Sequence, residues 1–106
     1  MSVALIPEND HLLLVVHSSR IDGDNKIFMT VKQSDLEPGI FASIEIDLQA
    51  VVYLNSLGIA EIISVFRYFK GEREKLKMVL KNVDASIAKL FDVVELAHVF
   101  EIHLKP

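Results

Sequence analysis

The stretch with the clearest chemical potential is Asn55-Ser56, which lies between two apolar patterns of different period. Residues 44–54 form an apolar run typical of a β-strand, whereas the apolar residues of 59–69 recur at helical spacing. Asn and Ser are preferred helix N-caps, because their side-chain oxygens accept the unpaired N–H groups of the first turn. A helix N-terminus also favours an anion such as a phosphoryl group. The pattern therefore predicts a hydroxyl at a helix start, where Ser56 is either a cap or a phosphorylation site.

An enzymatic role for Ser56 is a third hypothesis. A nucleophilic serine needs an adjacent base and an oxyanion site, and no base lies near Ser56 in the sequence. No phosphate-binding glycine loop and no local metal-ligand motif occurs. We therefore expect a non-enzymatic protein with no metal and no cofactor. The histidines are too dispersed for a standard ligand motif: His11, His17, His98 and His103.

Composition narrows the class of protein. The 106 residues fit a single domain, 1–106, with ample material for a core because 51% of them are hydrophobic. A net charge of −4 disfavours nucleic acid as a partner. There is no cysteine, no basic signal sequence, and no apolar run near the roughly 20 residues that span a bilayer. We expect a soluble cytoplasmic protein without membrane insertion.

Strand and helix patterns alternate along the chain, which indicates an α/β fold with a partly parallel sheet and helices packed on it. The segment 25–33 favours a helix capped by Asp24 or Asn25, although its β-branched residues leave a strand as the alternative. The predicted strands are 3–6 and 11–17 as a hairpin, 43–48 with 51–54 as its continuation after a kink, 76–80 and 100–104; further helices begin near 56 and at Asp84, with another helical piece at 93–98.

The helix that begins near Ser56 has two stripes of residues at 100° per residue. The first is apolar and is expected to face the sheet: Ile59, Ile62, Ile63, Phe66 and Phe69. The second lies roughly opposite and is less polar than a purely solvated face: Leu57, Glu61, Ser64 and Tyr68. It is either a contact surface for a partner or an ordinary solvated face with scattered apolar residues.

Several segments in order resemble the STAS domain of bacterial anti-sigma factor antagonists. In that family, a strand ending in Asp-Leu leads to an Asp-Ser-(Ser/Thr)-Gly-Leu motif that opens a helix, and a later Leu-Phe precedes the last strand. The matching segments are Ile44-Glu45-Ile46-Asp47-Leu48, Asn55-Ser56-Leu57-Gly58-Ile59-Ala60 and Leu90-Phe91-Asp92-Val93-Val94-Glu95-Leu96, with Arg20-Ile21-Asp22 similar to a family motif before the first helix. The resemblance implies a STAS-like mixed sheet of about five strands, partly parallel, with helices mainly on one face.

The resemblance also implies a function. In such proteins, the serine that corresponds to Ser56 is phosphorylated by a cognate anti-sigma factor of the serine-kinase type, and a serine phosphatase reverses the modification. The unphosphorylated form binds the anti-sigma factor. The implied partner-binding residues are Asp22, Asn55, Ser56, Leu57, Gly58, Glu61, Ser64 and Tyr68.

Two positions depart from the family motif. Asn55 replaces the aspartate and removes a charge beside the hydroxyl, and Leu57 replaces the second hydroxyl residue. The alternative function is therefore a non-phosphorylated STAS adaptor subunit of a signalling or transport complex, which binds through the apolar Leu57. A scaffold that self-associates, for example as a homodimer, is a further hypothesis.

Overall fold

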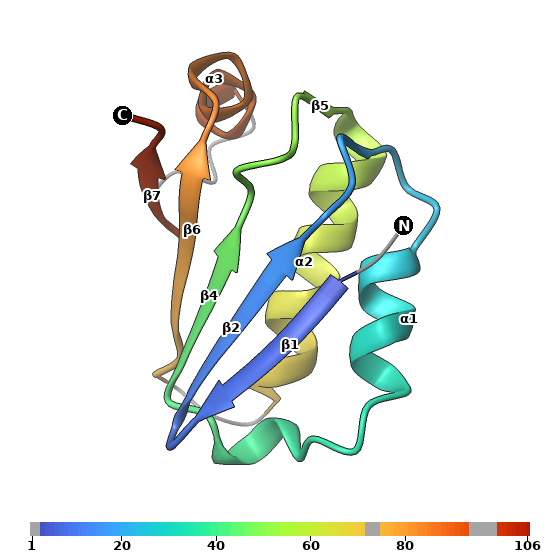
Figure 1. Cartoon of the computed structure of the whole chain (residues 1–106), viewed down its shortest axis with the longest axis vertical. Helices are drawn as coiled ribbons and strands as arrows, with labels where there is room; N and C mark the ends of the chain where they lie inside the picture. Colours follow the sequence, from blue (N-terminus) through green and yellow to red (C-terminus); the bar gives the residue numbers. More distant parts are fainter. Residues whose placement is uncertain (1–2, 72–74, 94–99) are drawn as a thin grey trace.

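The computed structural model describes residues 3–71, 75–93 and 100–106 (Figure 1). In chain order, the elements are β1 (Val3–Glu8), β2 (His11–Val16), β3 (Arg20–Ile21), α1 (Lys26–Lys32), the short 3-10 helix η1 (Pro38–Ile40), β4 (Ser43–Asp47), β5 (Tyr53–Leu54), α2 (Ser56–Lys70), β6 (Lys77–Val83), α3 (Ala85–Val93) and β7 (Glu101–Leu104). None of the helices in these ranges is long and apolar enough to cross a membrane.

The main sheet has five strands in the order β1-β2-β4-β6-β7. β1 and β2 pair antiparallel, and each of the other neighbouring pairs is parallel. The predicted hairpin and the predicted partly parallel sheet are therefore confirmed. β1 continues through Pro7 to Glu8, because an edge strand tolerates a residue without an N–H. The hairpin turns at Asn9, which has a positive φ of 56°.

The helices explain why the sheet has a buried side. Figure 1 shows α1 and α2 on one face of the sheet and α3 near the end of β6. Segment 25–33 is helical, which is the structure that the sequence favours over a strand. It forms a helix because Ile27 and Val31 are buried one turn apart on the same side. Asp24 accepts a hydrogen bond from Lys26 N–H at 3.2 Å just before this helix. The predicted arrangement of helices on one face is confirmed for α1 and α2.

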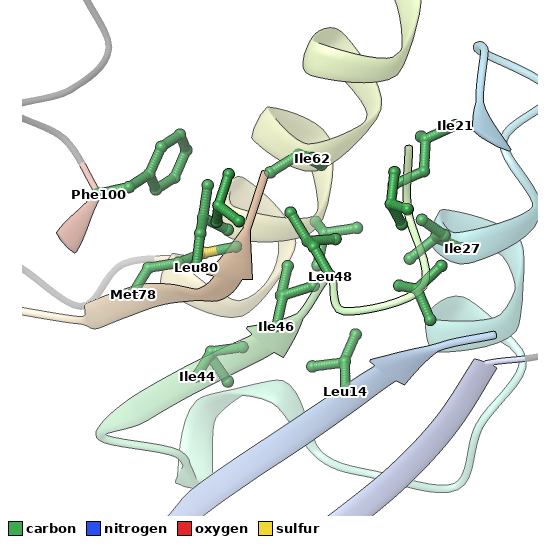
Figure 2. Packing of buried hydrophobic residues seen from close by; sticks show 14 of the residues in the cluster. Leu14, Ile21, Ile27, Ile44, Ile46, Leu48, Ile62, Met78, Leu80 and Phe100 are labelled. Carbon is green, nitrogen blue, oxygen red and sulfur yellow. The ribbon is translucent and has the colours of Figure 1, made fainter. Parts of the chain in front are cut away.

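The hydrophobic core lies between that face and the helices (Figure 2). Leu14, Ile46 and Leu80 point into it from β2, β4 and β6, and Ile62 meets them from α2. Leu14 pairs with Ile46, which pairs with Leu80, so the three side chains form one row across the sheet. The alternation along each strand thus determines which residues meet the helices.

One strand prediction needs correction. Segment 51–54 does not continue the strand of 43–48. The chain leaves the main sheet after Asp47, and β5 pairs in parallel with β3 in a separate two-stranded sheet. The cause is a tertiary contact, because Val52 and Tyr53 N–H both donate to Ser19 O, at 2.9 and 3.1 Å. The predicted helical piece at 93–98 lies almost entirely outside the described residues.

The buried face of α2 is wider than the predicted apolar stripe. Ile59, Ile62 and Phe69 are buried as expected, whereas Ile63 and Phe66 are only partly buried. Val65 is fully buried instead. The shift arises because α2 packs against α1 as well as against the sheet.

Glu61 lies within this buried face, with 2% of its surface exposed. Its Oε2 accepts hydrogen bonds from the N–H groups of Ile27 at 2.8 Å and Phe28 at 3.2 Å, in the first turn of α1. Within the described part of the chain, Oε1 has no hydrogen-bond partner. Loss of hydration raises the pKa of Glu61; the two N–H groups oppose this shift, and Asp24 adds to it. Glu61 therefore joins α2 to α1, and the prediction that it faces a partner is wrong.

We predict that Glu61 makes the unfolding free energy fall as pH rises. Both states bind the proton below the ordinary glutamate pKa. As pH rises through that value, the unfolded chain releases the proton before the folded chain does. The contribution of Glu61 to the unfolding free energy therefore decreases, and it is fully lost once the pH has passed the raised pKa of the folded state. Glu61→Gln has no such loss. The difference in unfolding free energy, Glu61→Gln minus the unmodified chain, should increase from about pH 4 to about pH 7 in urea titrations.

The matched control is Glu37→Gln, which removes one negative charge at an exposed position. Any constant cost of burying the substituted amide in the Glu61 site cancels, because only the change with pH is compared. If the difference in unfolding free energy stays constant or decreases as pH rises, desolvation does not determine the direction of the Glu61 pKa shift.

Candidate functional site

The first turn of α2 is built around an asparagine cap. Asn55 has extended backbone, and its Oδ1 accepts a hydrogen bond from Gly58 N–H at 2.8 Å. Its Nδ2 donates to Asp22 O at 3.4 Å, which connects the helix start to the loop after β3. Asn55 therefore satisfies one of the free helix donors and also holds a neighbouring loop.

Ser56 is the first residue of α2 and is exposed. The expectation that a hydroxyl caps this helix is wrong, because the amide oxygen of Asn55 occupies that role. The predicted change from an extended segment to a helix at Asn55-Ser56 is correct. Leu57 follows with 62% of its surface exposed. A hydroxyl and a large apolar side chain thus lie together, open to solvent, at the positive end of a 15-residue helix.

Close packing against β3 fixes the position of this turn. A Cβ added to Gly58 would lie 2.2 Å from Ile21 O and 2.6 Å from Leu54 Cδ1, so only glycine fits. Gly23 makes a second close approach, because a Cβ there would lie 2.4 Å from Leu57 Cβ. Gly23 also has a positive φ of 96°. Backbone on both sides therefore holds the first turn of α2 in one place.

An aromatic contact extends the exposed surface beyond α2. Arg20 and Tyr53 are register partners in the two-stranded sheet, and the Arg20 guanidinium lies 4.1 Å from the centre of the Tyr53 ring. Arg20 Nε also lies 3.7 Å from Asp22 Oδ2. Val52, beside them, is 64% exposed. The surface around Ser56 thus combines exposed apolar groups with one ion pair.

Known proteins share the fold of this chain. The sequence matches the profile of the STAS domain over residues 5–106. The chain belongs to the STAS domain family. An anti-sigma-factor antagonist (STAS) domain protein from Planctomyces limnophilus shares the fold with a TM-score of 0.74, at 14% identity over 98% of this chain and 91% of that one. No curated protein matches the sequence significantly.

Two further structures place this STAS domain among known folds. The anti-sigma factor antagonist SpoIIAA, in its unphosphorylated form, has a TM-score of 0.61 at 12% identity, over 99% of this chain and 89% of SpoIIAA. The murine anion transporter Slc26a9, in its inward-facing state, has a TM-score of 0.59 at 14% identity. That match covers 86% of this chain and 14% of the transporter. The STAS-like α/β fold expected from the sequence is confirmed.

The structure separates the predicted partner-binding residues of this STAS domain into three groups. Asp22, Asn55, Ser56 and Leu57 lie together around the start of α2. Gly58 and Glu61 are buried, so the expectation of direct partner contact is wrong for both. Helix packing is the reason, since Gly58 meets β3 and Glu61 meets α1.

The last two predicted residues lie further along α2. Ser64 is half-buried and its hydroxyl donates to Ala60 O at 3.0 Å. Tyr68 is also half-buried, with its ring edge-on to Phe28 and Phe69 at 6.0 and 5.5 Å between centroids. Tyr68 therefore serves the contact between α1 and α2, and the stripe opposite the sheet is not a uniform open surface.

Sequence reasoning missed Arg20, Val52 and Tyr53 as members of the exposed surface. The apolar Val52 and the aromatic Tyr53 are visible in the sequence, but the pattern predicts segment 51–54 as the continuation of a main-sheet strand. Only the pairing of β5 with β3 brings Tyr53 beside Arg20. Among the described residues, no group of three or more His, Asp or Glu side chains could hold a metal ion.

We predict that Gly58→Ala destabilises the fold. The added methyl group would overlap Ile21 O and the Leu54 side chain, and overpacking of this kind costs about 1–3 kcal/mol. Gly39→Ala is the control, because nothing lies within 4 Å of its added Cβ. Its unfolding free energy should stay within about 0.5 kcal/mol of the unmodified value. Urea unfolding measures both, and equal effects would contradict the close approach of α2 to β3.

Proposed function

We propose that this STAS domain is a partner-switching binding protein. Its partner is an anti-sigma factor of the serine-kinase type, which binds the surface around Ser56 and phosphorylates that residue; a serine phosphatase restores the binding form. The proposed setting is the bacterial cytoplasm. One observation carries the proposal: Ser56 is exposed in the first turn of α2 beside the exposed Leu57.

Electrostatics supports a switch at this position. A phosphate on Ser56 adds about −1.5 to −2 charges, which the N-terminus of α2 tolerates in the free protein. In a complex, the same phosphate would lose its hydration beside the apolar Leu57, where the cost of desolvation disfavours it. The modification therefore lowers affinity for the partner while the fold persists.

The family membership supports a binding role, and the likeness to SpoIIAA supports the fold that presents the serine. SpoIIAA is an anti-sigma factor antagonist with an unphosphorylated form. We extend partner binding to this chain because its own geometry leaves the matching serine accessible. The experiment that tests the proposal measures phosphate on Ser56, and its outcome does not depend on the likeness to SpoIIAA.

A specific observation favours a second function. The residue before Ser56 is Asn55, and its neutral oxygen is already bound to Gly58 N–H. No carboxylate stands at that position to orient a hydroxyl or a kinase-bound cation. The alternative is a non-phosphorylated STAS adaptor subunit of a signalling or transport complex, which binds through Leu57, Val52 and Tyr53.

Phosphorylation distinguishes the two functions. We expect a candidate anti-sigma kinase with ATP to add one phosphate to the protein, as measured by intact mass spectrometry, and Ser56→Ala to abolish the addition. Ser86→Ala is the matched control, because Ser86 is an exposed serine in the first turn of α3. Phosphate that persists in Ser56→Ala would contradict the assignment of the site.

Binding measurements give a separate test. We expect Ser56→Glu to weaken binding of the partner by roughly tenfold or more, since a charge is then desolvated in the interface. Leu57→Ser should weaken binding to a similar extent in both functions, through lost apolar contact. Ser86→Glu should leave the affinity unchanged. A strong loss in Leu57→Ser with no phosphate acceptance by Ser56 would select the adaptor function.

A further inference from the structure

The face of the sheet opposite α1 and α2 has an apolar stripe over β1 and β2. Strand register places Ala4 opposite Val15 and Ile6 opposite Leu13 on this face, because their neighbours Leu5 and Leu14 point into the core. Ile6 is 48% exposed, and the other three are half-buried. In the part of the chain that the structure describes, no helix crosses this face of β1 and β2 (Figure 1).

The sequence of β2 is unusual for a strand with one solvated face. Residues Leu12 to Val16 are all aliphatic, a pattern typical of strands covered on both sides. The next strand behaves differently, because β4 presents Ser43, Glu45 and Asp47 on the same face. On β6 the same face has the buried Val79 between Lys77 and Lys81, so the exposed part of the apolar stripe is local to the hairpin. Its composition favours a second molecule that covers it.

Charges at the border of the stripe select the chemistry of that molecule. Glu8 ends β1, while Glu45 and Asp47 stand beside Leu13 and Val15 on β4. His11 lies at the same border, with its Nε2 4.0 Å from Glu45 Oε2. The lysines of this face, Lys77 and Lys81, are one strand further away on β6. The nearest carboxylates thus form an acidic border around aliphatic side chains.

The border argues against a second copy of the chain as the occupant. A symmetric pair joined through the stripe would bring Glu8, Glu45 and Asp47 of both copies around the same apolar contact, where like charges repel. Pairing at the edge of β1 is also disfavoured, because Pro7 lacks the N–H that a strand ladder needs. A partner with positive charges beside an apolar face meets neither obstacle.

We propose that the open face of the β1–β2 hairpin binds a basic amphipathic helix of a partner protein. Successive side chains on one face of a strand are about 6.7 Å apart, close to the roughly 5–6 Å between helix residues three or four apart. A helix about 10 Å wide also matches two strands about 4.8 Å apart. Its apolar residues contact Ala4, Ile6, Leu13 and Val15, and its Lys or Arg residues meet the acidic border. This surface lies on the opposite side of the sheet from α2 and is independent of Ser56.

The test uses a fluorescent peptide of about four helical turns, built from leucine and lysine with all leucines on one face. We expect it to bind the full chain, measured by fluorescence anisotropy, and to shift the amide resonances of residues 4–6 and 13–15. A peptide with glutamate in place of lysine, and a scrambled peptide without an apolar face, are the controls. Both should bind at least roughly tenfold more weakly.

Variants of the chain locate the site. Ile6→Ser and Leu13→Ser should each weaken peptide binding by roughly tenfold, because a buried aliphatic contact is lost. Glu8→Gln with Glu45→Gln should weaken binding and flatten its dependence on salt. Met29→Ser, at an exposed methionine of α1 on the helix-covered side of the sheet, should bind the peptide normally. Dispersed amide spectra confirm that each variant folds.

Four outcomes overturn the proposal: absence of binding, equal binding of the glutamate peptide, resonance shifts confined to Ser56 and Leu57, and a dimer in light scattering that Ile6→Ser dissociates. The last outcome assigns the stripe to a second copy. None of them changes the phosphorylation test at Ser56, so the two proposals fail separately.

Discussion

The close approach of α2 to the backbone of β3 is the constraint on which the proposed site depends. Gly58 packs against Ile21 O at a distance that excludes any side chain, and Asn55 closes the helix end in the same turn. Because the inner side of that turn is fixed against β3, the side chains of Ser56 and Leu57 have to point outward. The exposure of Ser56 and Leu57 is therefore a consequence of packing, and not a property of their own residue types.

A second contact strengthens the same arrangement from the other side of α2. Glu61 accepts two N–H groups from the first turn of α1, so α1 and the loop that precedes it are held beside the helix start. The cost is a buried carboxylate with one oxygen that lacks a hydrogen bond among the described residues. Gly23, in that loop, lies against Leu57, which connects the docking of α1 to the exposed surface.

The two faces of the sheet thus have different roles. One face carries the helices and the core, and its carboxyl end presents the surface that we assign to partner switching. The other carries aliphatic side chains over the hairpin and charges over β4 and β6. A small STAS domain with two separate surfaces could hold one partner through the hairpin while its contact at Ser56 is switched.

The sequence by itself determined the class of fold, the order of the main-sheet strands and α-helices along the chain, and the change to a helix at Asn55-Ser56, because period and capping preferences act over a few residues. It also determined the STAS resemblance through the spacing of its motifs. Tertiary structure alone decided the pairing of Tyr53 with Arg20 and the burial of Glu61. Both depend on residues far apart in the chain. For Glu61, a helical projection of α2 cannot distinguish a second buried face of the helix from a solvated one. The same limit explains why Asn55, and not Ser56, is the cap: both residue types fit, and only the backbone conformation at the helix start selects between them.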